Sequence, residues 1–172
     1  FIEQIESLAL IASEFSNFAK LPDTPFSRID LVEIIKRSIE IYDNSEDLTI
    51  TFKYSNPEVI VNGSRDHLLR IFNNLLKNAL EAIPSGVKGK IDVILEVQGQ
   101  GALIMLSDNG RGIPEDLKDK IFNPNFTTKS SGTGLGLAFV KQAVENMLGI
   151  INFTTEQEKG TTFFIRVPLD AE

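Results

Sequence analysis

The sequence contains no cysteine and only one histidine, His67, among its 172 residues. It can therefore form neither a disulfide framework nor a thiolate metal site, and no histidine cluster is available for zinc or iron. A basic surface is also lacking, because 24 acidic residues outnumber 17 lysines and arginines and give a net charge of −7. This balance argues against non-specific attraction to nucleic acid or anionic lipid, so a polyphosphate ligand would have to be held locally, with a metal ion.

Long apolar runs are missing as well. No segment reaches the roughly 18 apolar residues that a bilayer-spanning helix requires, and the chain starts at Phe1 without a basic, signal-like segment. We therefore expect a soluble, cytoplasmic piece of a longer protein, whose intact form could still be membrane-anchored. The 172 residues, 42% of them hydrophobic, predict one ordinary globular core with a short appendage.

The start of the chain has the apolar spacing of a helix that buries a narrow seam. Apolar residues recur at alternating spacings of four and three: Phe1, Ile5, Leu8, Ala12, Phe15 and Ala19. This pattern favours a helix with a partner helix, and an amphipathic helix packed on its own domain is the alternative. Pro22 and Pro25 end the pattern. We predict a helical segment at 1–22, a linker at 23–29 and the main domain at 30–172.

Helical and strand patterns alternate along the main domain. Helices are predicted at residues 31–42, with Asp30 as N-cap, at 64–83, with Ser64 as N-cap, and at 135–147. Strands are predicted at residues 48–54, 58–61, 90–97, 102–107, 149–155 and 162–167. This order predicts an α+β fold, a two-layer sandwich in which a mixed, mostly antiparallel sheet carries helices on one face.

The helix at residues 64–83 carries a polar stripe beside a broad apolar arc. The stripe consists of Arg70, Asn74, Lys77, Asn78 and Glu81. Asn78 lies at the edge of the apolar arc, where a cleft would open. Asparagine is a weak helix former, so a requirement other than helix stability favours it here. Amide oxygens suit Mg²⁺ that already contacts phosphate, although a merely solvated polar face remains the alternative for this helix alone.

The sequence DNGRGIP at residues 108–114 directly follows the apolar strand at 102–107. Asn-Gly between apolar runs is a strong hairpin signal. However, Pro114 begins a helix-start pattern, and no returning strand follows. The glycines would instead let the backbone pass close to a flat ligand, and Asp108 could accept a hydrogen bond from an exocyclic amine.

A second glycine-rich stretch, at residues 126–137, turns from polar residues into a helix start. Backbone N–H groups at such a start bind phosphate, and the flanking glycines and serines predict a mobile lid. A dinucleotide-binding fingerprint is the alternative, with Glu156 as its acidic residue, but the spacing here is GxGxG and no strand precedes it. It is not a P-loop, because no Lys-Ser/Thr pair follows the last glycine.

In this order and spacing, the motifs resemble the histidine-kinase branch of the superfamily that includes DNA gyrase, the chaperone Hsp90 and the mismatch-repair protein MutL. The matching segments are the N box at 73–82 (NNLLKNALEA), the first glycine box at 108–112 (DNGRG), the F box at 122–129 (FNPNFTTK), the second glycine box at 132–137 (GTGLGL) and the closing strand at 160–163 (GTTF). Residues 15–22 (FSNFAKLP) resemble the end of the dimerisation and phosphotransfer domain. The resemblance implies the Bergerat ATP-binding fold, and the wording of the N and F boxes is similar to nitrogen-regulation sensor kinases.

The resemblance also implies residue roles. Asn78 would coordinate the Mg²⁺ that bridges the ATP phosphates, with Asn74 and Lys77 assisting as catalytic residues. Asp108 would read the adenine amine, Gly112 would admit the ring, and Thr161 would support Asp108. The second glycine box would close over the phosphates. The implied ATP-binding set is Asn74, Asn78, Asp108, Gly110, Gly112, Ile113, Phe122, Thr128, Lys129, Gly132, Thr133, Gly134, Leu135, Gly136, Leu137 and Thr161.

The implied reaction is transfer of the terminal phosphoryl group of ATP to a histidine, mainly through positioning and charge neutralisation. His67 falls in the first turn of the N-box helix, so we interpret it as a surface or packing residue. The acceptor histidine and its acidic base are expected upstream of Phe1. The implied partners are a second copy, through the N-terminal helix, and the receiver domain of a response regulator, without nucleic acid or direct membrane contact.

Two departures from the family pattern bear on function. Asn74 stands where hydrolytic relatives are expected to carry a glutamate base, and an amide cannot abstract a proton from water, which favours a kinase. Glu81 keeps an ATPase that drives conformational change open as an alternative. Asn125 replaces the usual second aromatic of the F box. A degenerate nucleotide-binding dimerisation module is a third possibility, against which the intact Asn78 and Asp108 argue.

Overall fold

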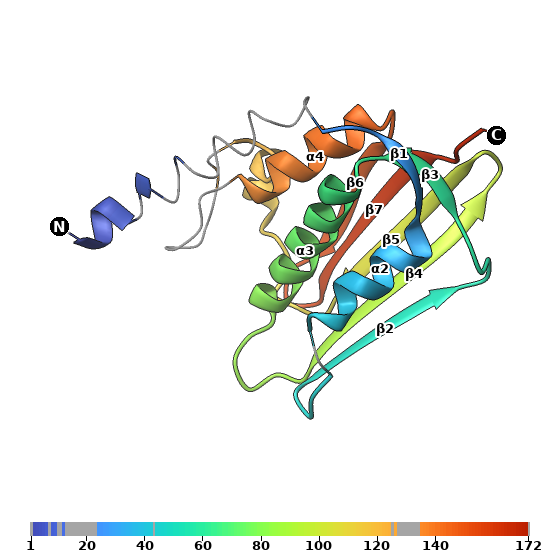
Figure 1. Cartoon of the computed structure of the whole chain (residues 1–172). Coiled ribbons are helices and arrows are strands. Elements are labelled where there is room, and N and C mark those ends of the chain that lie inside the picture. Colours follow the sequence, from blue (N-terminus) through green and yellow to red (C-terminus); the bar gives the residue numbers. More distant parts are fainter. Residues whose placement is uncertain are drawn as a thin grey trace.

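The computed structural model describes residues 2–6, 8–9, 12, 24–42, 44–124, 126 and 135–171. Within these ranges a five-stranded sheet carries helices on one face (Figure 1). None of the described helices is long and apolar enough to span a bilayer. The elements follow in the order β1 (Ser27–Asp30), α2 (Leu31–Glu40), β2 (Leu48–Tyr54), β3 (Ile60–Gly63), α3 (Arg65–Ala82), β4 (Gly89–Gln98), β5 (Gly101–Asp108), a 3₁₀ helix (Glu115–Lys120), α4 (Gly136–Asn146), β6 (Ile150–Glu156) and β7 (Gly160–Pro168).

The main sheet has the strand order β2-β4-β5-β7-β6. β2 pairs parallel with β4, and the other three pairings are antiparallel. Alternation along the strands determines which face is covered: Ile165 and Val167 of β7 are buried, whereas Arg166 between them is exposed. The mixed, mostly antiparallel sheet predicted from the sequence is confirmed.

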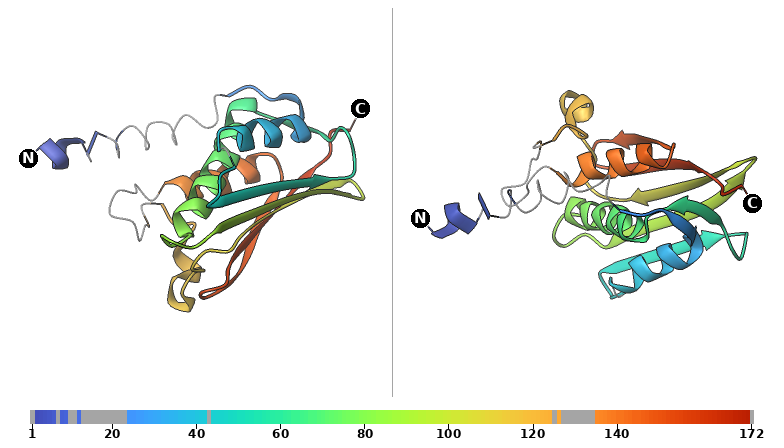
Figure 2. Two further views of the ribbon diagram at one scale, coloured as in Figure 1. Left: turned by 90° about the horizontal axis from the view of Figure 1, so that it is seen from below. Right: turned by 45° about the horizontal axis from the view of Figure 1, so that its top comes forward.

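Helices α2, α3 and α4 cover one face of this sheet (Figure 2). α2 begins at Asp30, whose carboxylate accepts hydrogen bonds from the backbone N–H groups of Val32 and Val59, both at 3.0 Å. α3 begins at Ser64, whose hydroxyl accepts from the N–H of His67 at 3.3 Å. Both predicted N-caps are therefore confirmed. The α3 side chains buried against the sheet and its neighbours include Leu68, Ile71, Phe72, Leu75, Leu76 and Ala79.

Most predicted elements lie within two residues of the observed ones, and one strand was missed. β1 falls partly within residues 23–29, which were predicted to be a linker, and pairs antiparallel with β3. A four-residue strand is too short for its alternation to be recognised, and it is stabilised by pairing with a distant segment, from Ser27 opposite Gly63 to Asp30 opposite Ile60. β3 itself lies two residues later than predicted.

The predicted N-terminal segment, residues 1–22, is described only in part. Residues 2–6, 8–9 and 12 are helical. Among them, Ile5 and Leu8 are 64% and 66% exposed, as expected of apolar side chains that would pack on another helix. The partner helix and the boundary at residue 22 remain predictions.

Candidate functional site

The polar stripe predicted on α3 lies at the surface of the helix, and one of its asparagines contacts the start of α4. Asn74 and Asn78 are half-buried, while Lys77 and Glu81 are exposed. The side-chain amide of Asn74 donates to the backbone carbonyl of Gly136 at 3.5 Å. The N box and the second glycine box, 62 residues apart in sequence, are therefore neighbours in the fold.

The adjacent Asn73 does not belong to this group. Its amide oxygen accepts a hydrogen bond of 2.6 Å from the hydroxyl of Tyr42, which follows α2. Burial raises the pKa of Tyr42, and the negative charge of Glu81 adds to the rise, so the phenol remains a donor at neutral pH. Asn73 thus links two helices, and this contact accounts for an asparagine that the sequence left unexplained.

The loop after β5 does not return as a hairpin, so that alternative is wrong; the next element is a 3₁₀ helix. Asn109 fixes the start of the loop, because its amide oxygen accepts from the N–H of Lys90 at 2.8 Å and its amide nitrogen donates to the carbonyl of Lys88 at 2.9 Å. The side chain therefore holds the loop against the beginning of β4.

The rest of the loop is held by two further elements. The N–H of Arg111 donates to the carbonyl of Ala82 at the end of α3, at 2.9 Å, and its own carbonyl accepts from Glu158 at 2.7 Å. The N–H of Ile113 donates to the hydroxyl of Thr155 on β6 at 2.9 Å. The backbone that would face a flat ligand is consequently preorganised by α3, β4 and the β6–β7 hairpin.

Asp108 lies at the end of β5, at the base of this loop. Its carboxylate accepts a hydrogen bond of 2.8 Å from the N–H of Gly110 and another from the N–H of Thr161. Burial raises the pKa of Asp108, and the two backbone N–H groups partly offset that rise because they stabilise the charged form. The arrangement presents a fixed, partly desolvated acceptor, suited to an amine donor.

The glycines of the loop are required by the fold itself. Gly112 has a φ of 72°, and a methyl group on it would collide with the backbone carbonyl of Glu156. A methyl group on Gly110 would lie 2.7 Å from the carbonyl oxygen of Ala82. Close backbone packing therefore explains both glycines without a ligand, although the role predicted for Gly112 in admitting the adenine ring is not contradicted.

Gly160 and Gly136 differ in how closely other atoms approach the position of an added methyl group. Gly160 has a φ of 129°, and a methyl group there would collide with the backbone carbonyl of Asp108. At Gly136, by contrast, the nearest atom would be the amide oxygen of Asn74 at 3.5 Å, an ordinary contact. Among the described residues, nothing therefore requires glycine at this position, which leaves a closely approaching ligand as a reason for it.

Phe122, predicted to contact ATP, packs on an aromatic cluster. Its ring centroid lies 5.9 Å from that of Phe153 and 6.4 Å from that of Phe163, and the ammonium group of Lys141 lies 5.7 Å from its centroid. The described part of the second glycine box comprises the buried Leu135 and the half-buried Gly136 and Leu137. Predicted residues outside the described part of the chain are Asn125, Thr128, Lys129, Gly132, Thr133 and Gly134.

His67 is a packing residue, as interpreted from the sequence. It is 8% exposed, and its ring makes a T-shaped contact with the ring of Phe139, with centroids 5.7 Å apart. The guanidinium of Arg70 lies 3.9 Å from the centroid of Phe139. Burial lowers the pKa of His67, with a smaller contribution from Arg70, so the neutral ring is favoured. The three side chains join α3 to α4.

No sequence pattern indicated Thr155, whose hydroxyl contacts several segments of this site. Its hydroxyl contacts the loop after β5 and the start of β7 at once. Along β6, threonine is an ordinary strand residue, and no local pattern distinguishes Thr155 from the exposed Thr154. Only the pairing of distant segments identifies it.

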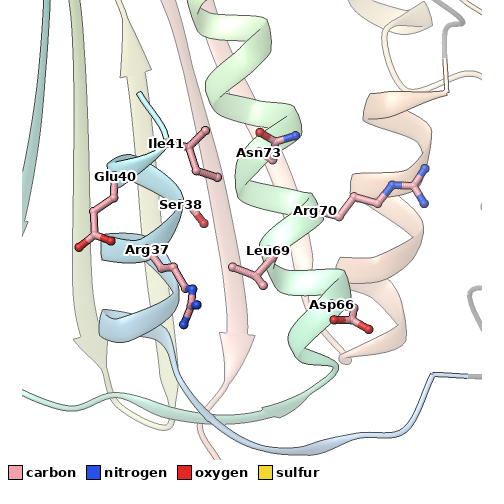
Figure 3. A pocket seen from close by; sticks show the side chains of 8 residues that line it. All are labelled: Arg37, Ser38, Glu40, Ile41, Asp66, Leu69, Arg70 and Asn73. Carbon is pink, nitrogen blue, oxygen red and sulfur yellow. The ribbon is translucent and has the colours of Figure 1, made fainter. Parts of the chain in front are cut away.

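A separate groove lies between α2 and α3 (Figure 3). It is lined by Arg37, Ser38, Glu40, Ile41, Asp66, Leu69, Arg70 and Asn73. Asn74, Asn78 and Asp108 are not part of its lining. Asn73 is the only N-box residue in this lining, and neither the predicted ATP-binding residues nor the loop after β5 line the groove, so we do not assign it to the candidate site.

Comparison with known proteins supports the assignment of the motifs. The family model for histidine kinase-, DNA gyrase B-, and HSP90-like ATPases matches residues 63–171. Sporulation kinase A of Bacillus subtilis (strain 168) is 32% identical over 169 residues, 96% of this chain and 28% of the relative. Sensor histidine kinase ZraS of Escherichia coli (strain K12) is 33% identical over 171 residues, 98% of this chain and 36% of the relative. The chain thus spans about a third of the length of these relatives.

Solved structures of histidine kinase ThkA share the fold. Its nucleotide-free catalytic domain aligns with a TM-score of 0.75 and 30% identity, over 84% of this chain and 98% of that chain. ThkA in complex with the response regulator protein TrrA aligns with a TM-score of 0.75 and 26% identity, over 97% of this chain and 48% of that chain. The chain therefore belongs to the family of histidine kinase-, DNA gyrase B- and HSP90-like ATPases, and within it to the catalytic domains of sensor histidine kinases.

Proposed function

We propose that this chain binds ATP and Mg²⁺ and supports transfer of the terminal phosphoryl group to a histidine located upstream of it in the intact sensor kinase. The observation that carries the proposal is the contact between Asn74 and Gly136, because it joins the N-box helix to the start of α4. The fixed loop around Asp108 supplies the second half of the site.

The adenine end of the proposed site is the carboxylate of Asp108. It accepts from two backbone N–H groups and retains acceptor capacity for the exocyclic amine of adenine. The loop backbone around Gly110, Gly112 and Ile113 forms the wall beside it, held in place before any ligand arrives. Preorganised hydrogen-bonding groups bind without the cost of ordering the loop.

The phosphate end of the proposed site is the start of α4. Leu135 is its N-cap, and a leucine side chain cannot accept hydrogen bonds from the first-turn N–H groups. These groups and the helix dipole favour a phosphate there, close to the amide of Asn74. We assign Phe122, Thr128, Lys129, Gly132, Thr133, Gly134, Leu135, Gly136 and Leu137 to contacts with ATP, as the motifs imply.

Asn78 is the proposed Mg²⁺ ligand, and its chemistry fits that role. Among the described residues, no group of three or more histidines and carboxylates could hold a metal ion. A single half-buried amide can complete a coordination shell that phosphate oxygens mostly fill, without repelling them as a carboxylate would. When bound, the ion neutralises charge on the phosphates, and the exposed Lys77 adds positive charge nearby.

A kinase fits the side chains better than an ATPase. Asn74 occupies the position of a hydrolytic base and cannot take a proton from water. The buried His67 packs against Phe139, so it is unsuited to accept a phosphoryl group. The exposed Glu81, two turns along α3 from Asn74, is the one stripe residue that could act as a base, and it defines the ATPase alternative.

The proposed partners follow from the relatives. ThkA has been solved in complex with a response regulator, and we propose a receiver domain as the phosphoryl acceptor that follows the histidine. We also propose that the exposed apolar residues of the N-terminal helix pair with a second copy. A cytoplasmic location fits a site that requires ATP.

Calorimetric titration with ATP, with and without Mg²⁺, tests the proposal. Asn78→Ala should weaken Mg²⁺-dependent ATP binding by about tenfold or more, the cost of a lost ligand to a charged group. Asn73→Ala is the matched control on the same helix, because Asn73 contacts Tyr42 instead. Equal ATP affinity in all three proteins would refute the site.

A phosphate-release assay separates the two enzyme classes. The wild-type chain should bind ATP with negligible turnover, because its acceptor histidine is absent. Rapid phosphate release that Glu81→Ala abolishes would establish the ATPase alternative instead. Failure of the wild-type chain to bind ATP at all would support the degenerate module.

A further inference from the structure

One hydroxyl group, that of Thr155, connects the two segments that flank Asp108. Its oxygen accepts from the N–H of Ile113 at 2.9 Å, in the loop after β5. It also lies 3.1 Å from the carbonyl oxygen of Gly160 and 2.9 Å from the hydroxyl oxygen of Thr161, at the start of β7. Thr155 thus joins β6, β7 and the loop at a single atom.

These contacts lie beside the acceptor proposed for adenine. The N–H of Thr161 donates to the carboxylate of Asp108, and Gly160 is packed closely against the backbone of the same residue. Thr155 and Thr161 are opposite each other in the β6–β7 pairing, and Thr161 is only 6% exposed. A shift of the Thr155 hydroxyl would therefore displace Gly160 and Thr161, which both lie against Asp108.

Because each hydroxyl group has only one proton, the hydrogen bond that Thr155 donates also determines whether Thr161 can donate to a ligand. Thr155 has one proton and two acceptors within reach, the carbonyl of Gly160 and the hydroxyl of Thr161. If Thr155 donates to Thr161, the Thr161 proton is free to point toward a ligand. If Thr155 donates to Gly160, the hydrogen bond between the two hydroxyls uses the Thr161 proton, and Thr161 can only accept a hydrogen bond from a ligand.

We propose that Thr155 is a positioning residue for adenine recognition: its hydroxyl holds the Ile113 backbone and sets the hydrogen-bond direction of Thr161 beside Asp108. This inference rests on the proposed function, because it assumes that adenine binds at Asp108. Thr155, which lies outside the family motifs, would thereby help the site to distinguish adenine from purines that lack the exocyclic amine.

The test measures ATP affinity in Thr155→Val, a variant with the same shape and β-branching but no hydroxyl. ATP binding should weaken about tenfold, because the Ile113 N–H loses its acceptor and Thr161 loses its partner. Thr155→Ser restores the hydroxyl and should bind within about threefold of the wild type. Thr154→Val is the control, because Thr154 is exposed on the opposite face of β6.

A second nucleotide separates recognition from folding. The triphosphate of purine riboside has the purine ring of ATP without its amine, so it cannot use the Asp108 acceptor. Thr155→Val should weaken ATP binding at least about threefold more than it weakens binding of this analogue. Equal losses for the two nucleotides, or no loss for either, would overturn the proposal. Absence of ATP binding by the wild-type chain would instead reject the proposed function.

The wild-type chain provides a measurement that does not depend on any variant. Amide hydrogen exchange followed by NMR should show the Ile113 N–H protected in the free protein, because Thr155 accepts from it. Exchange of the Ile113 amide at the rate of an open chain would refute the contact and the proposal. Thr155→Ser should preserve the protection.

Discussion

Replacing Gly112 or Gly136 by alanine should have opposite effects on stability and binding. A side chain at Gly112 must adopt a φ of 72°, in the left-handed region, which costs about 1–2 kcal/mol for a non-glycine residue. The added methyl group also collides with the carbonyl of Glu156, and forcing a group into a packed site costs about a further 1–3 kcal/mol. Gly112→Ala should therefore lower the free energy of unfolding by about 2–5 kcal/mol.

Gly136→Ala should leave the fold intact. Within the described part of the chain, its methyl group would meet only the amide of Asn74, at 3.5 Å, and alanine is the better helix former by up to about 1 kcal/mol. If the backbone of Gly136 lies against the ATP phosphates, the same methyl group occupies their space. A steric cost of about 1–3 kcal/mol corresponds to roughly 5- to 150-fold weaker ATP binding.

Thermal unfolding without nucleotide and calorimetric titration with ATP distinguish the two variants. For a chain of this size, about 2–4 °C in Tm accompanies each kcal/mol, so Gly112→Ala should melt at least about 4 °C below the wild type. Gly136→Ala should melt at or slightly above the wild-type Tm. An unchanged Tm for Gly112→Ala would refute the close-packing argument, and full ATP affinity in Gly136→Ala would refute the phosphate contact.

Three further variants test individual side chains. The pKa of Asp108 is raised above its ordinary value of 3.8, and ATP affinity should fall as the pH is lowered through it, because a protonated carboxyl is a poorer acceptor. Asp108→Asn should bind ATP weakly, and its ATP affinity should depend less on pH. The unfolding free energy should decrease as the pH falls below 6.5 toward the lowered folded-state pKa of His67, because the unfolded chain takes up the proton first. In urea unfolding, His67→Phe should lack this part of the pH dependence. Glu158 has a φ of 66°, so Glu158→Gly should raise the unfolding free energy by about 0.5 kcal/mol in the same assay, and a decrease would contradict the strain argument.

The sign for Asp108 differs between folding and binding. Its folded-state pKa is raised, so between the ordinary and the raised value the folded chain holds more protons than the unfolded chain. Its contribution to stability is therefore present at low pH and is lost as the pH rises through the folded-state pKa. ATP binding has the opposite dependence, because the ligand requires the ionised carboxylate. Opposite pH dependences of stability and ATP binding are expected at a site whose ionised carboxylate destabilises the fold but is required for the ligand.

Local sequence was sufficient for the elements whose signals are carried by neighbouring residues. The broad apolar arc of α3 repeats every three or four residues, and its N-cap, Ser64, lies three residues before His67, whose N–H donates to the Ser64 hydroxyl. β2 was predicted with the bounds that it has, because its alternation is complete within seven residues. The motif order likewise identified the family without any knowledge of the fold.

Residues far apart in sequence determined the remainder. β1 was missed because its partner, β3, lies outside any local window, and β2 pairs parallel with β4 only after α3 has crossed the sheet. The pKa of Asp108 depends on its burial and on N–H groups from both its own loop and β7. Strand pairing and pKa shifts depend on tertiary packing, which the apolar periodicity of the sequence does not specify.

The sequence by itself determined the composition of the site: amides on one edge of a helix, an acid after an apolar strand, and glycines before another helix. Only the tertiary structure decided what each group contacts. It explains Gly112 by the backbone of Glu156 and brings Thr155 to Ile113 across 42 residues. The physical reason is that hydrogen bonds and close contacts act over a few ångströms in space, and only the folded backbone sets which distant residues come within that range.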